Sequence, residues 1–323
     1  MISNQRNHKH ILVTGGCGYV GTNLTNRLLN DGHRVTVVDI MWFGNFLGND
    51  ENLTVIKADI RDIAQVPMKG IDTIVHLANI ANDPTGDLNS KLTWEVNVLA
   101  SMLLIEKAIK NGVEQFIYAS SGSVYGVKNE PDVIEDLSLV PISDYNKTKM
   151  ISERVLMSYQ DKLTLQIIRP ATVCGYSPRM RLDLSVNMLT MQALTNGRIT
   201  VFGGQQTRPN IHMNDMIGVY LHFLELGKKA PGIYNAGFEN ISILDIAEKV
   251  TNHIPAEIEI TESDDPRSYR QNSDKLIGTG FSPEYGIENG IKDVIEMYNA
   301  GTMKDEDRYY NMRTMKKIFL KDE

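Results

Sequence analysis

Residues 14–21 read Thr-Gly-Gly-Cys-Gly-Tyr-Val-Gly, and they stand between an apolar run at 10–13 and a helical pattern at 20–30. A side chain at Gly15 would obstruct a tight turn, one at Gly18 would keep the backbone away from a pyrophosphate, and one at Gly21 would spoil the packing of helix on strand. The helix that follows offers free N–H groups and a positive dipole to phosphates. The stretch therefore predicts a strand, a turn and a helix that bind a dinucleotide.

An acidic residue stands where such a site needs one. Asp39 ends the next apolar run, 34–39, eighteen residues beyond Gly21. A carboxylate at this place accepts hydrogen bonds from the adenosine ribose hydroxyls and repels a 2′-phosphate. The sequence therefore predicts NAD rather than NADP as the cofactor.

Predicted strands and helices alternate through the first half of the chain. Apolar runs predict strands at 10–14, 34–39, 53–58, 73–78, 115–120 and 163–169. Helices are predicted at 20–30 and 93–110, and Gly32 and Gly112 follow them where left-handed caps belong. The alternation predicts a Rossmann-type α/β fold, in which helices cover both faces of a doubly wound parallel sheet.

The alternation loosens after about residue 170. Helices are predicted at 184–195, 215–225 and 244–253, with a short strand at 199–202, and Ser242 is placed to cap the last helix. We expect residues 8–175 to form an NAD-binding domain and residues 176–323 to form mainly a smaller α/β substrate-binding lobe, interleaved with the first. The charged tail at 303–323 predicts either a frayed helix or an oligomer contact.

The composition excludes several classes of protein. The chain has 323 residues and a net charge of −7, which argues against a nucleic-acid binder because such proteins need a basic face. Its two cysteines, Cys17 and Cys174, stand outside any Cys/His pattern typical of a metal site, so no metal is expected. The N-terminus is polar, and no apolar run is long enough to span a membrane. We therefore expect a cytoplasmic protein without nucleic-acid or membrane partners.

A serine turn and a Tyr-x-x-x-Lys pair indicate acid–base chemistry. Residues 119–126 read Ala-Ser-Ser-Gly-Ser-Val-Tyr-Gly, and Tyr145 and Lys149 lie one helical turn apart on the same face. A lysine ammonium near a phenol favours the phenolate, as does a positive nicotinamide ring, so we expect Lys149 and the cofactor together to lower the pKa of Tyr145 toward neutral. A tyrosine with that pKa can take the proton from a hydroxyl as hydride leaves the same carbon. The alternative is a solvated surface pair, which the glycine loop and the serine turn make the weaker interpretation.

Taken together, these motifs resemble those of extended short-chain dehydrogenases/reductases, in particular the nucleotide-sugar epimerases and dehydratases. The resemblance covers residues 10 to about 285. The matching features are residues 14–21, Asp39, Ala-Asp-Ile-Arg-Asp at 58–62, His-Leu-Ala at 76–78, Asn97, Ser-Val-Tyr-Gly at 123–126, Tyr145 with Lys149, Arg169-Pro170, and Arg-Pro-Asn-Ile-His-Met-Asn-Asp at 208–215.

The resemblance implies roles for individual residues. The catalytic residues are expected to be Ser121, Tyr145 and Lys149, with Ser123 as the second choice for the helper hydroxyl. The residues expected to bind NAD are Gly15, Gly18, Tyr19, Val20, Asp39, Asp59, Ile60, Leu77, Ala78, Asn79, Asn97, Tyr145 and Lys149. The residues expected to bind the substrate are Ser121, Ser123, Asn187, Arg208 and Arg267, with Arg270 as the alternative to Arg267 as a second phosphate-binding cation.

The implied reaction is reversible hydride transfer between NAD and C4 of a nucleoside-diphosphate sugar, most simply a 4-epimerisation. A C4 dehydrogenase or 4-keto reductase would use the same residues. A 4,6-dehydratase ranks lower, because its family members place Asp-Glu where this chain has Gly122-Ser123. A non-catalytic NAD-binding protein also ranks lower, because it need not keep all three of Ser121, Tyr145 and Lys149. Family members are often dimers, here expected through the helices at 93–110 and 144–159.

Overall fold

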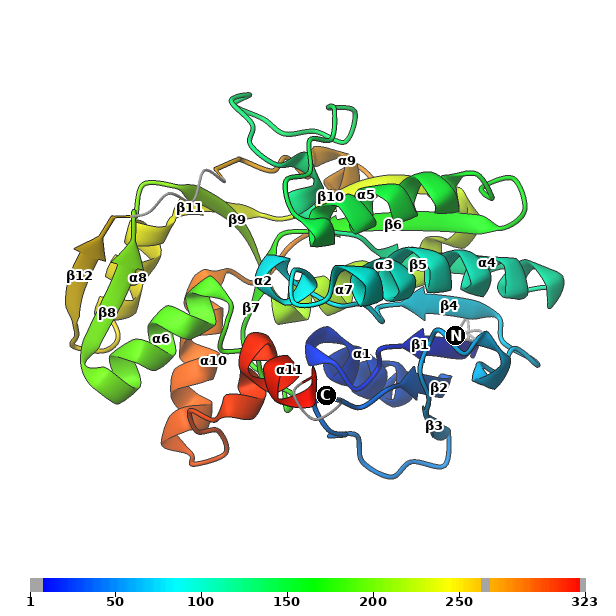
Figure 1. Cartoon of the computed structure of the whole chain (residues 1–323), viewed down its shortest axis with the longest axis horizontal. Coiled ribbons are helices and arrows are strands. Elements are labelled where there is room, and N and C mark those ends of the chain that lie inside the picture. Colours follow the sequence, from blue (N-terminus) through cyan, green and yellow to red (C-terminus); the bar gives the residue numbers. More distant parts are fainter. Residues whose placement is uncertain (1–7, 263–267, 320–323) are drawn as a thin grey trace, which may run out of the picture.

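The computed structural model describes residues 8–262 and 268–319, and it is built on a seven-stranded parallel sheet (Figure 1). The strand order is β10-β6-β5-β4-β1-β2-β3. The strands of this sheet are β1 (His10–Thr14), β2 (Arg34–Asp39), β3 (Leu53–Lys57), β4 (Thr73–His76), β5 (Gln115–Ala119), β6 (Thr164–Pro170) and β10 (Gly232–Ala236). The predicted Rossmann-type sheet is therefore confirmed.

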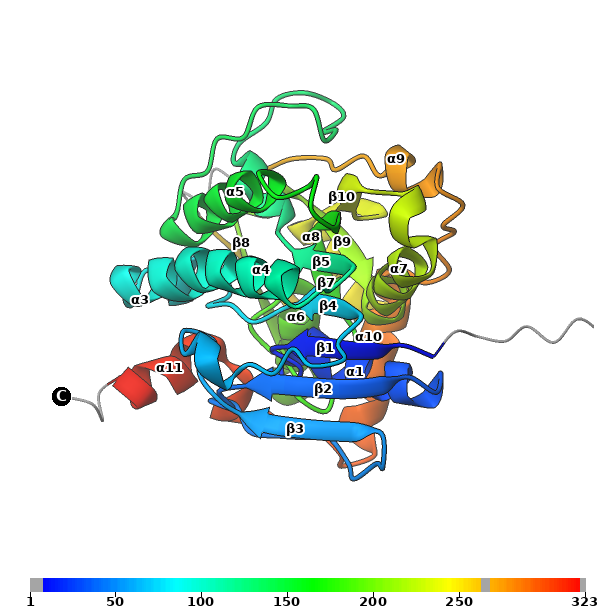
Figure 2. The same ribbon diagram turned by 90° about the vertical axis from the view of Figure 1, so that its right-hand side faces the viewer.

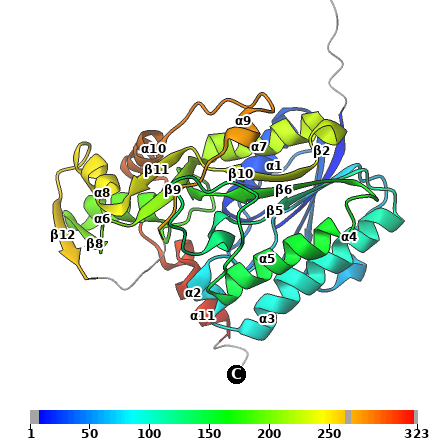
Figure 3. The same ribbon diagram turned by 90° about the horizontal axis from the view of Figure 1, so that it is seen from above.

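Helices cover both faces of the sheet, as Figures 2 and 3 show. One layer holds α1 (Tyr19–Asn30) and α7 (Met213–Leu226), and the other holds α3 (Ser90–Trp94), α4 (Ala100–Lys110) and α5 (Asp144–Met157). Successive side chains of a strand point to opposite faces. Accordingly Ile11 and Val13 pack in the core beneath the first layer, whereas Leu12 packs in the core beneath the second.

The strand order fixes where a ligand can bind. β1 pairs with β2 on one side and with β4 on the other. The chain therefore builds the sheet outward from β1 in one direction through β2 and β3, and then returns to add β4 on the opposite side of β1. Ligands of such sheets bind at the carboxyl ends of the strands next to this reversal. The turn after Thr14 and the residues after His76 lie at this edge.

A second lobe completes the fold. It contains a small sheet of β7 (Thr172–Cys174), β9 (Thr207–His212) and β11 (Glu239–Ser242), and a pair of β8 (Arg198–Phe202) with β12 (Glu257–Thr261). Its helices are α6 (Ser185–Asn196), α8 (Ile243–Thr251) and α10 (Ile287–Asn299). The short helices α2 (Asp83–Gly86) and α9 (Asp274–Ile277) lie in connections. Both α7 and β10 come from the second half of the chain but belong to the large sheet and its layer, so the two parts are interleaved.

Two elements differ from their predicted form. The helix predicted at 93–110 is α3, a π-helical turn at Glu95–Leu99, and α4. The charged tail forms α11 (Asn311–Phe319), which packs near α2 with Met315 buried in the core of the large domain. The Ser242 hydroxyl accepts a hydrogen bond from Asp245 N and caps α8 as predicted. Among the described residues, no helix is long and apolar enough to cross a membrane.

Candidate active site

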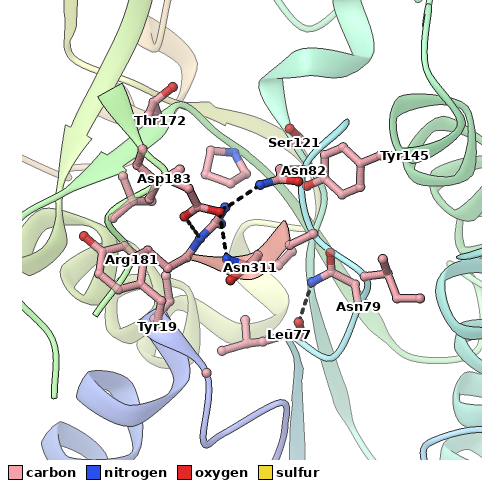
Figure 4. A pocket seen from close by; sticks show the side chains of 18 of the residues that line it. Tyr19, Leu77, Asn79, Asn82, Ser121, Tyr145, Thr172, Arg181, Asp183 and Asn311 are labelled. Carbon is pink, nitrogen blue, oxygen red and sulfur yellow. Dashed lines mark hydrogen bonds and ion pairs between the residues drawn. The ribbon is translucent and has the colours of Figure 1, made fainter. Parts of the chain in front are cut away.

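A cavity of about 650 Å³ opens at the carboxyl ends of the strands, between the large sheet and the second lobe. Its walls come from β1–α1, β2, β4, the serine turn, α5, the segment after β7, and α11. Figure 4 shows part of it, with Tyr145 and Ser121 on one side and Arg181 and Asp183 on the other. Residues that are more than a hundred positions apart in the sequence thus face one space.

The glycine loop has the shape that a dinucleotide requires. Gly15 has φ +73°, and a Cβ on it would lie 2.6 Å from Ala78 N. A Cβ on Gly21 would lie 2.2 Å from the carbonyl oxygen of Gly15. Both contacts are with backbone atoms, so neither position accepts a side chain without movement of the loop. The loop therefore keeps backbone N–H groups at the start of α1 within reach of phosphates, and the residues present fit NAD.

Asp39 lies at the adenosine end expected for the cofactor. One carboxylate oxygen accepts a hydrogen bond from Cys17 N at 3.0 Å, and the other accepts one from Met41 N at 2.7 Å. Burial raises the pKa of Asp39, and these two hydrogen bonds oppose the rise. Because an ionised carboxylate oxygen has a second lone pair, the group can still accept hydrogen bonds from ribose hydroxyls.

The Tyr145–Lys149 pair projects from the first turns of α5 into the cavity. The Ser143 hydroxyl caps this helix by accepting a hydrogen bond from Asn146 N at 3.2 Å. Lys149 Nζ donates to the carbonyl oxygen of Ala119 at 2.7 Å, and the residue is only 2% exposed. The local cap and the strand end β5 thus fix where both catalytic candidates lie.

The serine turn supplies a second hydroxyl beside the tyrosine. The Ser121 side chain is hydrogen-bonded to Tyr145, and its Oγ lies 2.7 Å from Ser123 Oγ. Ser123 in turn donates to Asn146 Oδ1 at 2.5 Å. Ser121 is therefore the serine in contact with the tyrosine, and Ser123 holds Ser121 in place through the hydrogen bond between their hydroxyls.

Without the cofactor, the protein does not lower the pKa of Tyr145 toward neutral. Burial raises the pKa of Tyr145 to about 12, and the hydrogen bond with Ser121 only partly opposes this. Burial also lowers the pKa of Lys149 to about 7, although the Glu153 carboxylate works to raise it. Lys149 Nζ lies 5.9 Å from the centre of the Tyr145 ring. Desolvation therefore outweighs the lysine, and the phenolate needs a further positive charge in the cavity.

Most of the predicted NAD-binding residues line the cavity. They are Gly15, Gly18, Tyr19, Val20, Asp39, Asp59, Ile60, Leu77, Ala78 and Asn79, beside Tyr145 and Lys149. Asn97 does not line the cavity. It is 1% exposed, accepts a hydrogen bond from Ile80 N at 2.8 Å and donates to Thr148 Oγ1 at 3.0 Å. Asn97 therefore lies behind the wall of the cavity, where its hydrogen bonds connect the segment after β4 to α5.

The predicted substrate-binding residues also form two groups, those that line the cavity and those that do not. Ser121, Ser123 and Arg208 line the cavity. Asn187 does not, because it is fully buried and its amide is bonded to Gly175 N, Tyr19 Oη and the Arg181 carbonyl oxygen at 2.9–3.0 Å. Arg267 lies outside the described residues, and its alternative Arg270 is exposed and does not line the cavity.

A charged cluster faces Tyr145, and its residues are not among those that the family resemblance singles out. Arg181 binds Asp183 through two hydrogen bonds of 2.9 and 3.1 Å. Asp183 also accepts hydrogen bonds from Asn82 Nδ2 at 3.1 Å and Asn311 N at 3.2 Å (Figure 4). Burial works to raise the pKa of Asp183, but Arg181 outweighs it and holds the pKa below its usual range. The signal for this cluster was the charged run Ser-Pro-Arg-Met-Arg-Leu-Asp at 177–183.

Known proteins share this fold and can be aligned with most of this chain. The sequence model of the NAD dependent epimerase/dehydratase family matches residues 11–237. UDP-glucuronic acid decarboxylase 1 from Danio rerio is 27% identical over 92% of this chain and 74% of its own. UDP-glucose 4-epimerase from Lactobacillus helveticus is 26% identical over 88% of this chain and 94% of its own. A solved structure of MoeE5 with UDP-glucuronic acid and NAD superposes with a TM-score of 0.81 at 24% identity, over 90% of this chain and 99% of that one.

Proposed function

Because this chain belongs to the NAD dependent epimerase/dehydratase family, we propose that it interconverts nucleoside-diphosphate sugars by reversible hydride transfer at C4, with 4-epimerisation as the net reaction. One observation carries the proposal: the Ser121–Tyr145 hydroxyl pair, Lys149 and the glycine loop line the same cavity. A single space thus holds the acid–base group and the cofactor cradle.

NAD, when bound, supplies a hydride acceptor and returns the hydride. In the proposed reaction Tyr145 takes the proton of the 4-hydroxyl and later gives it back. Ser121 holds the substrate oxygen against the phenol. Lys149, fixed by the Ala119 carbonyl oxygen, adds positive charge beside Tyr145. Because the protein alone leaves the pKa of Tyr145 at about 12, we expect ionisation of Tyr145 to require the positive charge of the oxidised cofactor.

The walls of the cavity favour a neutral sugar carried on a diphosphate. Arg208, on β9, lies in the second lobe and supplies a cation for a phosphate. Besides Lys149, Arg181 is a cation close enough to affect the ionisation of Tyr145, and it is bound by Asp183. A sugar carboxylate near Tyr145 would have to compete with Asp183 for Arg181. We therefore rank a decarboxylase below an epimerase, although one of the relatives named above is a decarboxylase.

Dehydration and simple dehydrogenation rank lower for different reasons. Elimination of water needs a second acid–base pair, and Gly122-Ser123 supplies no carboxylate there. Asp83 also lines the cavity, but it accepts a hydrogen bond from the Ser143 hydroxyl, and Asp183 is paired with Arg181. A C4 dehydrogenase or keto reductase uses the same residues without turning the keto sugar, so only product analysis separates it from an epimerase.

The substrate can be identified by direct conversion. The purified protein is expected to carry NAD(H), released by denaturation and seen by chromatography. It is then incubated with UDP- and GDP-hexoses and with UDP-glucuronic acid, and products are followed by NMR. We expect a neutral hexose to reach a mixture of 4-epimers with no net change in cofactor. Net reduction of NAD would indicate a dehydrogenase, release of CO₂ a decarboxylase, and no conversion or binding of any sugar nucleotide would contradict the proposed substrate class.

Replacing Ser121 by Ala is expected to shift the pH dependence of the reaction. The Ser121 hydrogen bond lowers the pKa of Tyr145, so its loss raises that pKa. The limb on which kcat/KM rises with pH should therefore move to higher pH, and activity at neutral pH should fall roughly tenfold. Ser123→Ala is the matched control, with a smaller shift. If Ser123→Ala moves the limb and Ser121→Ala does not, Ser123 is the helper hydroxyl.

We further propose that two copies pair through α4 and α5. Next to α4, Trp94 is 38% exposed and Leu99 is 48% exposed. A second copy packed on this face would cover both apolar side chains.

A further inference from the structure

The segment at 175–183, which joins β7 to α6, is held against the dinucleotide-binding helix α1. Tyr19 Oη donates to the carbonyl oxygen of Gly175 at 2.6 Å, and Asn23 Nδ2 donates to that of Tyr176 at 2.9 Å. Asn187 Nδ2 donates to Tyr19 Oη at 3.0 Å and secures the same contact from α6. A part of the second lobe is therefore fixed beside the N-terminus of α1, where the glycine loop places phosphates.

Arg179 reaches into the cofactor part of the cavity from this segment. It is 2% exposed and lines the cavity together with Asp39 and Phe43. Its guanidinium carbon lies 4.0 Å from the centre of the Phe43 ring. Its charge also lies close enough to Tyr19 and Asp39 to interact with both. Arg179 therefore stands between the start of α1 and the adenosine-side acid.

The hydrogen bonds of Arg179 go to neutral oxygens, although Asp183 and Asp39 lie close enough for their charges to act on it. Nη1 donates to the carbonyl oxygen of Met180 at 3.1 Å, and Nη2 donates to Asn311 Oδ1 at 2.6 Å. Nε is buried and has no hydrogen-bond partner among the residues that the structure describes. Within those residues Arg179 makes no ion pair, whereas its neighbour Arg181 is paired with Asp183. Burial, and then Arg181, lower the pKa of Arg179 to about 9.

A buried guanidinium without a hydrogen-bonded anion is costly, so its retention calls for a negatively charged partner. We propose that Arg179 binds the pyrophosphate of NAD, and that Asn311 on the C-terminal helix α11 is the positioning residue that aims it. The planar guanidinium group can donate two parallel hydrogen bonds to phosphate oxygens, and its contact with the Phe43 ring keeps the group in one orientation. The second lobe and the C-terminal helix thus both help to retain the cofactor. This inference does not depend on which sugar reacts.

NADH titration followed by fluorescence tests the proposal without any sugar. The variants are Arg179→Met, Arg179→Lys and Asn311→Ala, with Arg198→Met as control because that side chain is 57% exposed and pairs with Glu257 and Glu259. We expect Arg179→Met to raise the Kd of NADH and of ADP-ribose roughly ten- to a hundredfold, while the weak affinity for adenosine stays unchanged. Arg179→Lys and Asn311→Ala should give smaller rises, and Arg198→Met none.

Melting curves of the NAD-free proteins separate binding from folding. Because Arg179→Met removes an incompletely compensated buried charge, its melting temperature should stay level or rise, whereas a structural role would lower it. An unchanged Kd for NADH in Arg179→Met would overturn the proposal. Equal losses for ADP-ribose and adenosine would also overturn it, because the effect would then not lie at the phosphates. Loss of NADP binding alone would assign Arg179 to a 2′-phosphate and contradict it as well.

Discussion

Tyr145→Phe is expected to lower kcat by about 10²–10⁴-fold on the sugar nucleotide that the protein converts. The change removes one oxygen, which is the group that takes and returns the substrate proton in the proposed reaction. The ring stays in place against Lys149, whose Nζ lies 5.9 Å from its centre. The Kd of NADH should therefore change far less than kcat. The measurements are steady-state rates and a fluorescence titration on the same preparation.

The matched control is Tyr159→Phe. Tyr159 follows α5 and donates a hydrogen bond to Glu106 Oε1 at 2.9 Å, and it does not line the cavity. Its variant should keep the kcat of the parent protein. If Tyr145→Phe is as active as the parent, Tyr145 is not the proton-transfer group and the proposed mechanism is wrong.

Gly21→Ala is expected to remove NAD binding and to destabilise the fold. The added Cβ would lie 2.2 Å from the Gly15 carbonyl oxygen and 2.7 Å from Gly16 Cα, so the loop has to move. Loss of backbone hydrogen bonds to phosphate would raise the Kd of NADH about a hundredfold or more. Overpacking of this kind costs roughly 1–3 kcal/mol, which lowers the melting temperature by roughly 2–8 °C.

Gly48→Ala controls for the loss of a glycine. A Cβ on Gly48 meets nothing within 4 Å, so this variant should bind NADH and melt like the parent. Differential scanning fluorimetry gives the melting temperature, and the NADH titration gives the Kd. An unchanged Kd in Gly21→Ala would show that the close approach of α1 to the loop is not needed for the cofactor.

Local sequence patterns were sufficient for the elements that surround the cofactor loop. β1 and β2 have the predicted bounds, and α1 begins one residue earlier than predicted. Their periodicity and glycines depend on neighbours in the chain, so they can be recognised without the fold. The helix predicted at 93–110 was only partly right, because a π-helical turn interrupts it at Glu95–Leu99. That turn contains Asn97, which is bonded to Ile80, and a contact with another segment is invisible to helical periodicity.

The charged tail illustrates the same limit. Its sequence predicted either a frayed helix or an oligomer contact. The structure forms a helix there, α11, beside the cavity, with Asn311 bonded to Arg179 and Asp183. A densely charged tail can face solvent, contact a partner or line a ligand site. The contacts that decide between them span more than a hundred residues of sequence.

The sequence by itself therefore determined the α/β class and NAD as the cofactor, and it predicted the NAD-binding loop and the Ser–Tyr–Lys set, because each depends on short spacings within one turn, strand end or helix. Only the tertiary structure decided that Asn97 and Asn187 stand behind the walls, and that Arg179, Arg181 and Asp183 face the cavity. It also places Tyr145 where burial raises its pKa to about 12 in the protein alone, so the expected lowering would need the nicotinamide charge as well as Lys149. Burial and pairing are properties of segments brought together by folding, and they set the energy of every charge in the site.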